Sequence, residues 1–126
     1  MKTLNFKNAI VSLLDDGIIH IHLKAFTEIT ITDAALIVEA IEKLGEQKKM
    51  PVLIDAGEYS TVDKEVRAFS ASEECNIFTK ADAIAYNNSG QKIIANFYLK
   101  QNKPQVPTKI FANKKDALVW LKTFIK

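Results

Sequence analysis

The sequence predicts an α/β protein with a single mixed, largely parallel β-sheet, an N-terminal antiparallel hairpin and about four helices. Three observations lead to this class. Short apolar runs, typical of strands, alternate along the chain with longer segments whose apolar residues recur at helical spacing. Only a short turn separates the first two runs. One helix separates each later pair of strands, which predicts parallel pairing through right-handed crossovers.

The hairpin is predicted from residues 9–14 and 18–24, with the Asp-Asp-Gly turn at 15–17 between them. The second strand alternates strictly, so His20 and His22 point to one face and its apolar residues to the other. Two histidines at this spacing can supply two metal ligands, but zinc needs a third and usually a fourth. Carboxylates would have to complete the set. We therefore expect no metal site and interpret both histidines as polar residues on a partly exposed sheet face.

The later elements alternate between helix and strand. Helix starts are placed at residues with capping side chains, and the buried strand after Pro51 is apolar on both faces, as in a central strand. The expected elements are a helix from Thr32 to about Leu44, a strand over 51–57, a helix from about Asp63 to Ile77, a strand over 82–87, a helix from the 88–90 turn to about Asn102, a strand over 108–112 and a helix capped by Asn113.

Length and composition fit one domain over residues 1–126. The chain is 48% hydrophobic and 25% charged, which is a globular balance. Cys75 is the single cysteine, so no internal disulfide can form, and the first residues are interpreted as folded chain rather than an export signal. These features predict a cytoplasmic location. No apolar stretch reaches the roughly 18 residues of a membrane span.

Charge is distributed unevenly along the chain. Residues 1–91 carry nine Lys and Arg against fourteen Asp and Glu, whereas residues 92–126 carry eight Lys and only Asp116. These lysines either lie on solvated surfaces or form a basic surface for an anionic ligand. Nucleic acid is not expected, because Arg67 is the only arginine and arginine is the usual reader of bases and phosphates.

The order of elements resembles the STAS domain, named for sulfate transporters and anti-sigma factor antagonists such as SpoIIAA. The segments 94–97, 103–104, 106–111 and 117–121 resemble an uncharacterised bacterial group of STAS-like (SpoIIAA-like) proteins. The resemblance implies a SpoIIAA-like topology over nearly the whole chain and a function in binding.

The resemblance also implies a position for a regulatory serine. Anti-sigma antagonists carry a phosphorylated serine directly after an aspartate at a helix start. Aligned without gaps from Asp55, that aspartate falls on Asp63 and the serine on Lys64, which cannot be phosphorylated in this way. Ser60 and Thr61 could substitute if the loop is shorter, or they could serve only as turn and capping residues.

Catalytic motifs are missing from the sequence. The four glycines are isolated and fit no phosphate-binding loop, and no nucleophile elbow surrounds any serine. Cys75 falls on the apolar side of a predicted helix, where a thiol is usually inert. We expect neither an enzyme nor a cofactor.

The best candidate for a ligand site is the edge where the parallel strands end, because ligands of open α/β sheets bind there. A helix start at the same edge could hold an anion. The alternative is a set of ordinary turns and caps. The residues expected at this edge are Asp55, Tyr59, Ser60, Asn87, Ser89 and Lys92.

The helix over 89–102 has apolar residues on an arc of roughly 240°, wider than one buried stripe. Either neighbouring elements cover it, or part of it meets a partner or an apolar ligand. We expect a non-enzymatic regulatory or protein-interaction module that acts through a protein partner or as a homodimer, with an apolar-ligand or anionic-lipid binding protein as the alternative. The interface or pocket residues are expected to be Ile94, Phe97, Tyr98 and Phe111.

Overall fold

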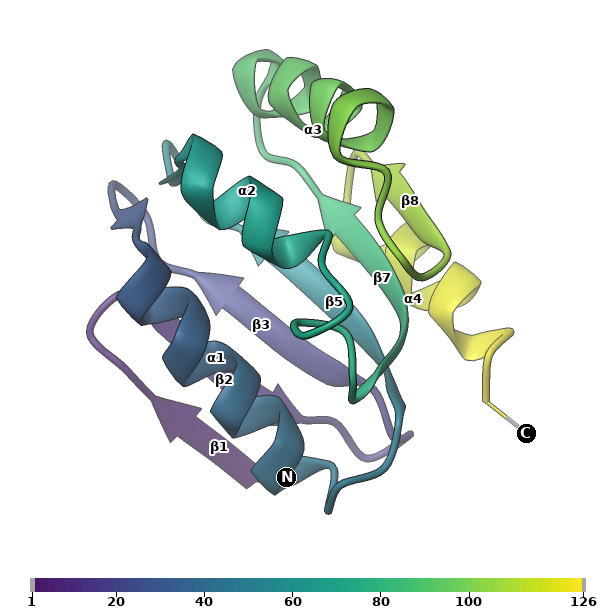
Figure 1. The fold of residues 1–126 in the computed structure, drawn as a ribbon. Coiled ribbons are helices and arrows are strands. Elements are labelled where there is room, and N and C mark those ends of the chain that lie inside the picture. Colours follow the sequence, from purple (N-terminus) through teal and green to yellow (C-terminus); the bar gives the residue numbers. More distant parts are fainter. Residues whose placement is uncertain (1, 126) are drawn as a thin grey trace.

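A six-stranded mixed sheet forms the centre of the computed structural model, which describes residues 2–125 (Figure 1). Met1 and Lys126, the ends of the predicted domain, lie outside the described residues. The strands are β1 (Lys2–Asn5), β2 (Ala9–Leu13), β3 (Ile19–Leu23), β5 (Met50–Ala56), β7 (Thr79–Ala85) and β8 (Thr108–Phe111). Their spatial order is β1-β2-β3-β5-β7-β8, with β1 to β3 antiparallel and β3, β5, β7 and β8 parallel.

Four helices cover the sheet unequally. They are α1 (Ile31–Leu44), α2 (Lys64–Ser70), α3 (Ser89–Asn102) and α4 (Lys114–Lys122). The first three lie on one face and α4 lies on the other (Figure 1). Two short strands, β4 (Glu28–Ile29) and β6 (Thr61–Val62), pair in parallel beside the main sheet. The predicted fold class is confirmed, including the opening hairpin and the central position of β5.

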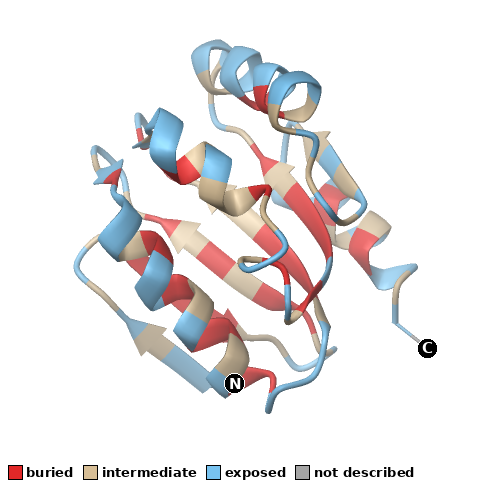
Figure 2. Ribbon diagram, viewed as in Figure 1, coloured by how far each residue is buried: buried red, intermediate tan, exposed pale blue. Residues whose placement is uncertain are grey.

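Two apolar cores follow from the alternation of side chains along the strands (Figure 2). On one face, Ile19 and Ile21 of β3 pack with α1. On the other, β7 presents alanines at 81, 83 and 85, and α4 packs on them through Ala117 and Leu121. Small side chains let a helix lie close to a sheet. Since α4 packs on β5, β7 and β8, it leaves the same face of β1 to β3 uncovered.

The start of α1 differs from the prediction. Its N-cap is Thr30 and not Thr32, because the Thr30 hydroxyl accepts from the Asp33 N–H while the Asp33 carboxylate accepts from the Thr30 N–H. This reciprocal capping box satisfies two otherwise unpaired helix donors. The Asn8 amide also donates to Asp33 at 3.0 Å and ties the helix start to the turn between β1 and β2.

The end of α2 also differs from the prediction. The helix begins after Asp63, as expected, but ends at Ser70 rather than at Ile77. The Asn76 side chain donates to the carbonyls of Ser70 and Ser72, at 2.9 and 2.6 Å. These side-chain bonds take the place of helical main-chain bonds and turn the chain toward β7.

One strand was predicted incompletely, and three short strands were not predicted. β7 begins at Thr79, not at residue 82, because Thr79 and Ala81 pair with Met50 and Pro51 across a register shift. β1, β4 and β6 were not predicted. β1 is a four-residue, mostly exposed edge strand whose polar sequence carries little strand signal, and β4 and β6 have only two residues each.

Gly57 marks a close approach between the ends of β3 and β5, and replacing it with Ala should destabilise the fold. Its N–H donates to the Leu23 carbonyl at 2.8 Å, and an added Cβ would overlap that carbonyl oxygen and crowd the Ala25 nitrogen. We expect Gly57→Ala to lower the free energy of unfolding by about 2–4 kcal/mol, measured by urea denaturation.

Gly17→Ala is the matched control. Gly17 has φ +87° but no atom near its would-be Cβ, so only backbone strain of about 1 kcal/mol should result. Equal losses in the two variants would contradict this account of Gly57.

Candidate functional site

A cavity of about 170 Å³ lies between the sheet and the helices α1, α2 and α3. Its wall is mainly aliphatic, because the strands of the parallel sheet direct every second side chain toward it. Apolar residues that line it include Ile21, Ile37, Ile41, Val52, Ile54, Val66, Ile84 and Ile94. A space of this size admits a small apolar molecule, since an engineered cavity of about 150 Å³ takes up benzene.

One side of the cavity carries ionisable groups. Asp82, in the middle of β7, is 8% exposed, and no hydrogen bond to its carboxyl group is found among the described residues. Burial raises the pKa of Asp82 to about 7. Burial raises the pKa of the Cys75 thiol to about 12 and also raises the pKa of Tyr98, and the charge of Asp82 adds to both shifts. The three groups therefore lie near one another on the cavity wall.

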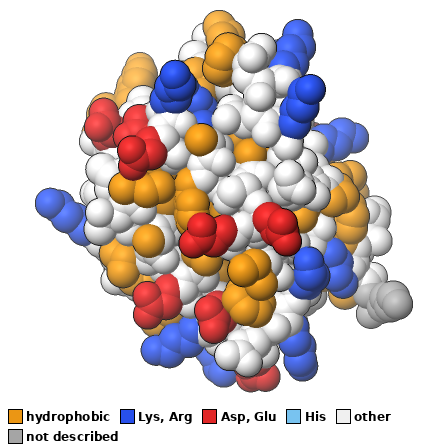
Figure 3. Space-filling model, viewed as in Figure 1, with side chains coloured by type: hydrophobic (Ala, Val, Ile, Leu, Met, Phe, Trp, Pro, Cys, Tyr) orange, Lys and Arg blue, Asp and Glu red, His pale blue; other side chains and the backbone are white. Residues whose placement is uncertain are grey.

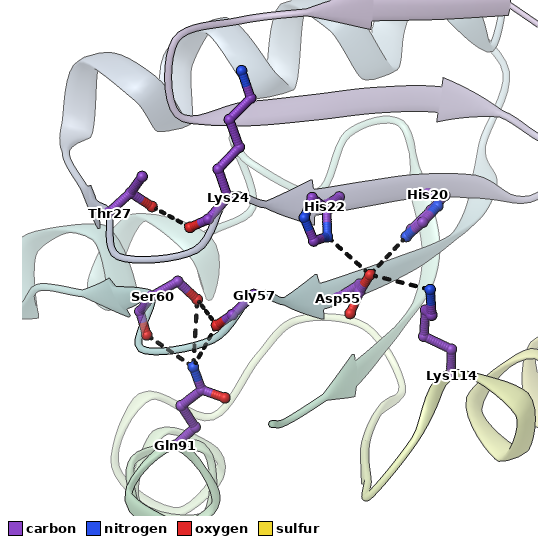
Figure 4. Close-up of polar contacts among 9 residues, drawn as sticks. All are labelled: His20, His22, Lys24, Thr27, Asp55, Gly57, Ser60, Gln91 and Lys114. Carbon is purple, nitrogen blue, oxygen red and sulfur yellow. Dashed lines mark hydrogen bonds and ion pairs between the residues drawn. The ribbon is translucent and has the colours of Figure 1, made fainter. Parts of the chain in front are cut away.

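The loop that follows β5 is hydrogen-bonded to α3 through the side chain of Gln91 (Figure 4). The Gln91 amide nitrogen donates to the carbonyls of Gly57 and Ser60, both at 3.0 Å, and its oxygen accepts from the Asn87 N–H at 2.6 Å. The Ser60 hydroxyl donates to the Gly57 carbonyl at 2.9 Å. These bonds hold the start of α3 beside the cavity and fix the conformation of the loop after β5.

A second polar cluster lies on the opposite face of the sheet (Figure 4). The Oδ2 atom of Asp55 is 3.2 Å from His20 Nε2, 3.0 Å from His22 Nδ1 and 3.7 Å from Lys114 Nζ. Burial alone would raise the pKa of Asp55, but the hydrogen bonds to both histidines and the charge of Lys114 outweigh it and lower the pKa. The carboxylate is therefore ionised and held between two imidazoles.

The structure separates the residues predicted at the strand ends. Asp55 belongs to the cluster with the histidines, on the face away from the cavity. Tyr59 is exposed and stacks on Phe26 with ring centroids 5.4 Å apart, and both have positive φ, which costs energy for such side chains. Ser60 is buried against Gln91, so its hydroxyl faces no solvent.

The other predicted residues gather at the start of α3. Asn87 contacts Gln91, Ser89 is the first residue of the helix, and Lys92 lies over the ring of Tyr86 with its Nζ 5.9 Å from the centroid. The helix cap is Asn88, whose side chain accepts from the Gln91 N–H at 2.9 Å.

Residues predicted as an interface or pocket fall into three environments. Ile94 and Tyr98 line the cavity. Phe97 is 52% exposed on the outer side of α3, next to Ile93, which is 69% exposed. Phe111 packs against Trp120 near α4, on the other side of the sheet.

Sequence reasoning missed Asp82 and Lys114 as site residues. Asp82 had a signal, because it is a charged residue inside the alternating segment KADAIAY, where its neighbours pack in the core. Lys114 had none, because it reaches Asp55 only through the packing of α4 against β5.

Comparison with known proteins gives the family. A family model described as "Domain of unknown function (DUF7793)" matches residues 12–125. The chain belongs to the DUF7793 family. A search of curated proteins found no match.

The SpoIIAA-like fold expected of this DUF7793 member is confirmed by a solved structure. The chain is similar to an uncharacterised protein of the DUF3478 family with a SpoIIAA-like fold from Shewanella loihica PV-4, at 19% identity and a TM-score of 0.58 over 90% of this chain and 91% of that one. A protein with unknown function from Arthrobacter sp. FB24 matches at 25% identity and a TM-score of 0.31, over 88% and 96% of the two chains. Among the described residues, no helix is both long and apolar enough to cross a membrane.

The buried carboxyl of Asp82 should make stability depend on pH. The folded chain keeps this proton up to about pH 7, whereas the unfolded chain releases it near the ordinary pKa of 3.8. Between these values the unfolded state binds fewer protons, so the free energy of unfolding falls as pH rises, by up to about 1.4 kcal/mol per pH unit. Above about pH 7 this contribution is constant.

We expect Asp82→Asn to remove this decrease in the free energy of unfolding with rising pH, measured by urea denaturation from about pH 4.5 to 8. Cys75 and Tyr98, whose pKa values the charge of Asp82 raises, remain in the variant. Glu39→Gln, on the exposed side of α1, is the control and should keep the wild-type slope. A slope equal to wild type in Asp82→Asn would contradict the prediction.

Proposed function

We propose that the protein is a non-enzymatic binding module for a small, mainly apolar molecule that carries one hydrogen-bond donor. The observation behind the proposal is the Asp82 carboxyl group, which is buried on an aliphatic cavity wall with no hydrogen bond found to it among the described residues. No fully enclosed side-chain oxygen or nitrogen of the described residues lacks a partner, so the Asp82 oxygens keep some accessible surface where they line the cavity. A polar group that loses most of its hydration and gains no hydrogen bond still costs free energy. A ligand hydroxyl or amine in the cavity would supply that partner.

The wall of the cavity suits binding better than chemistry. Its size and mainly apolar lining make the cavity suitable for a one-ring or similarly small ligand. The raised pKa of the Cys75 thiol keeps it protonated and unreactive at neutral pH. Within residues 2–125, neither imidazole makes a hydrogen bond to a serine or cysteine side chain that it could activate.

Titration with matched probe molecules tests the proposal. Toluene and benzyl alcohol have similar rings, and only benzyl alcohol offers a hydroxyl donor to Asp82. We expect benzyl alcohol to shift the amide NMR signals of cavity residues and to bind at least about tenfold more tightly than toluene at pH 7.5. Asp82→Leu, which removes the acceptor, should remove most of that preference.

A pair of adjacent substitutions controls for the location of binding. Ala34 faces the cavity from α1, and Ala35 is exposed one residue later. Ala34→Phe fills the space and should abolish binding of both probes, whereas Ala35→Phe should leave it unchanged. Binding that survives Ala34→Phe, in a variant whose circular dichroism matches wild type, would overturn the proposal.

The outer side of α3 favours a second candidate function, in which the protein pairs with a second copy of itself. Ile93 and Phe97 are four residues apart on one helix face and are both more than half exposed. Figure 3 shows hydrophobic side chains reaching the surface between charged ones on the face that carries α1, α2 and α3. Exposed apolar side chains of this kind often mark an interface.

This candidate predicts a dimer that depends on α3. If the dimer has a micromolar dissociation constant, sedimentation equilibrium at about 10–100 µM should detect it in wild type. The double variant with Phe97→Ser and Ile93→Ser should be monomeric. Val119→Ser, at an equally exposed apolar position of α4, is the control and should stay dimeric. A monomeric wild type would exclude this interface.

A further inference from the structure

Three metal-binding side chains converge on the sheet face that α4 leaves partly open. His20 and His22 project from β3, and Asp55 projects to the same side from the neighbouring strand β5 (Figure 4). One possible ligand atom from each residue, a ring nitrogen or a carboxylate oxygen, lies within 4.8 Å of the other two. We propose that these three residues bind a divalent transition-metal ion of the Zn²⁺ type.

The spacing of the ligand atoms suits such an ion. Ligands at zinc bond lengths of about 2.0–2.2 Å lie about 3.3–3.6 Å apart around a tetrahedral centre. The two imidazole nitrogens are 3.2 and 3.0 Å from Asp55 Oδ2. An increase of a few tenths of an ångström in each of these two distances would therefore reach the spacing of a tetrahedral site.

The backbone already fixes the three residues relative to one another. The register of β3 and β5 pairs His20 with Leu53 and His22 with Asp55, so the three side chains share one face. Both strands lie inside the sheet, between β2 and β7. A site on two paired strands loses little entropy when it binds an ion.

The chemistry of the ligands selects the kind of ion. Two imidazoles and one carboxylate favour zinc, cobalt and similar ions over magnesium and calcium, which prefer sites made of oxygen atoms. Three protein ligands leave a fourth tetrahedral position for water or another small ligand.

Lys114 allows a test of where on the chain the ion binds. Its ammonium group is 3.7 Å from Asp55 Oδ2, and its side chain is 56% exposed at the start of α4. The ammonium group competes with a cation for the carboxylate, and its exposed side chain can move into solvent when an ion binds. Removal of Lys114 should therefore strengthen metal binding at this cluster, whereas binding at another place on the chain should not change.

The test is titration of tag-free protein with Zn²⁺ by calorimetry and with Co²⁺ by visible absorption. We expect one ion per chain and a Co²⁺ spectrum of a four-coordinate nitrogen and oxygen site. The chain has two histidines, so long-range ¹H–¹⁵N spectra resolve both. Zinc should shift Nε2 of His20 and Nδ1 of His22 most strongly.

Single substitutions should act in opposite directions. His22→Gln, at the more exposed histidine, and Asp55→Asn should each weaken Zn²⁺ binding by more than about 100-fold, because loss of an outer-shell partner alone costs about 10–100-fold. Lys114→Ala should strengthen it by at least about threefold. Glu39→Gln, an exposed carboxylate variant on α1, is the control and should bind as wild type does.

Several outcomes would overturn the proposal. These are the absence of Zn²⁺ binding below about 0.1 mM in wild type, binding that is unaffected by His22→Gln, or a sulfur-to-cobalt charge-transfer band that places the ion at Cys75. The cluster lies on the opposite face of the sheet from the cavity, so probe binding in the cavity and metal binding here succeed or fail separately.

Discussion

Both candidate sites depend on the register between β3 and β5. This parallel pairing sets His22 opposite Asp55 and Ile21 opposite Ile54. The first pair faces the polar cluster, and the second lines the cavity. Because side chains alternate along a strand, a slip of one residue in β5 would turn Asp55 toward the cavity and Ile54 toward solvent. The burial of the apolar residues in both cores holds the register against such a slip.

The unequal covering of the sheet explains why a polar cluster can exist on its second face. Alanines on β7 let α4 lie close to that half of the sheet, and the first turn of α4 ends beside β5. Asp55 lies at this boundary, so it is largely buried yet reached by Lys114 from the helix start. The histidines on β3 lie just beyond the helix and remain partly exposed.

Much of the fold could be predicted from periodicity. The alternation of residues 18–24 placed both histidines on one face, and the apolar segment after Pro51 indicated a central strand. What failed was local and depended on side-chain hydrogen bonds, such as those of Asn76 that end α2 early. Short polar strands such as β1 lack a period that can be recognised.

The sites could be predicted only in part, for a different reason. The sequence indicated that His20 and His22 share a face. Their third neighbour, Asp55, follows them by 35 and 33 residues in the chain, and only the pairing of β3 with β5 brings it beside them. The cavity depends on the volume left between helices and sheet, which no pattern in the sequence encodes. The position of Asp82 could have been questioned, since a lone acid between core alanines is costly unless something compensates it.

The cavity has a consequence for how the protein is maintained. Side chains around this partly open space of about 170 Å³ lack some of the packing contacts of a filled core, and a domain is stable by only about 5–15 kcal/mol. Enlarging either of two alanines on its wall, Ala34 or Ala95, would fill much of it in a single step. A ligand bound in this space would therefore stabilise the fold in the way that a buried side chain of the core does.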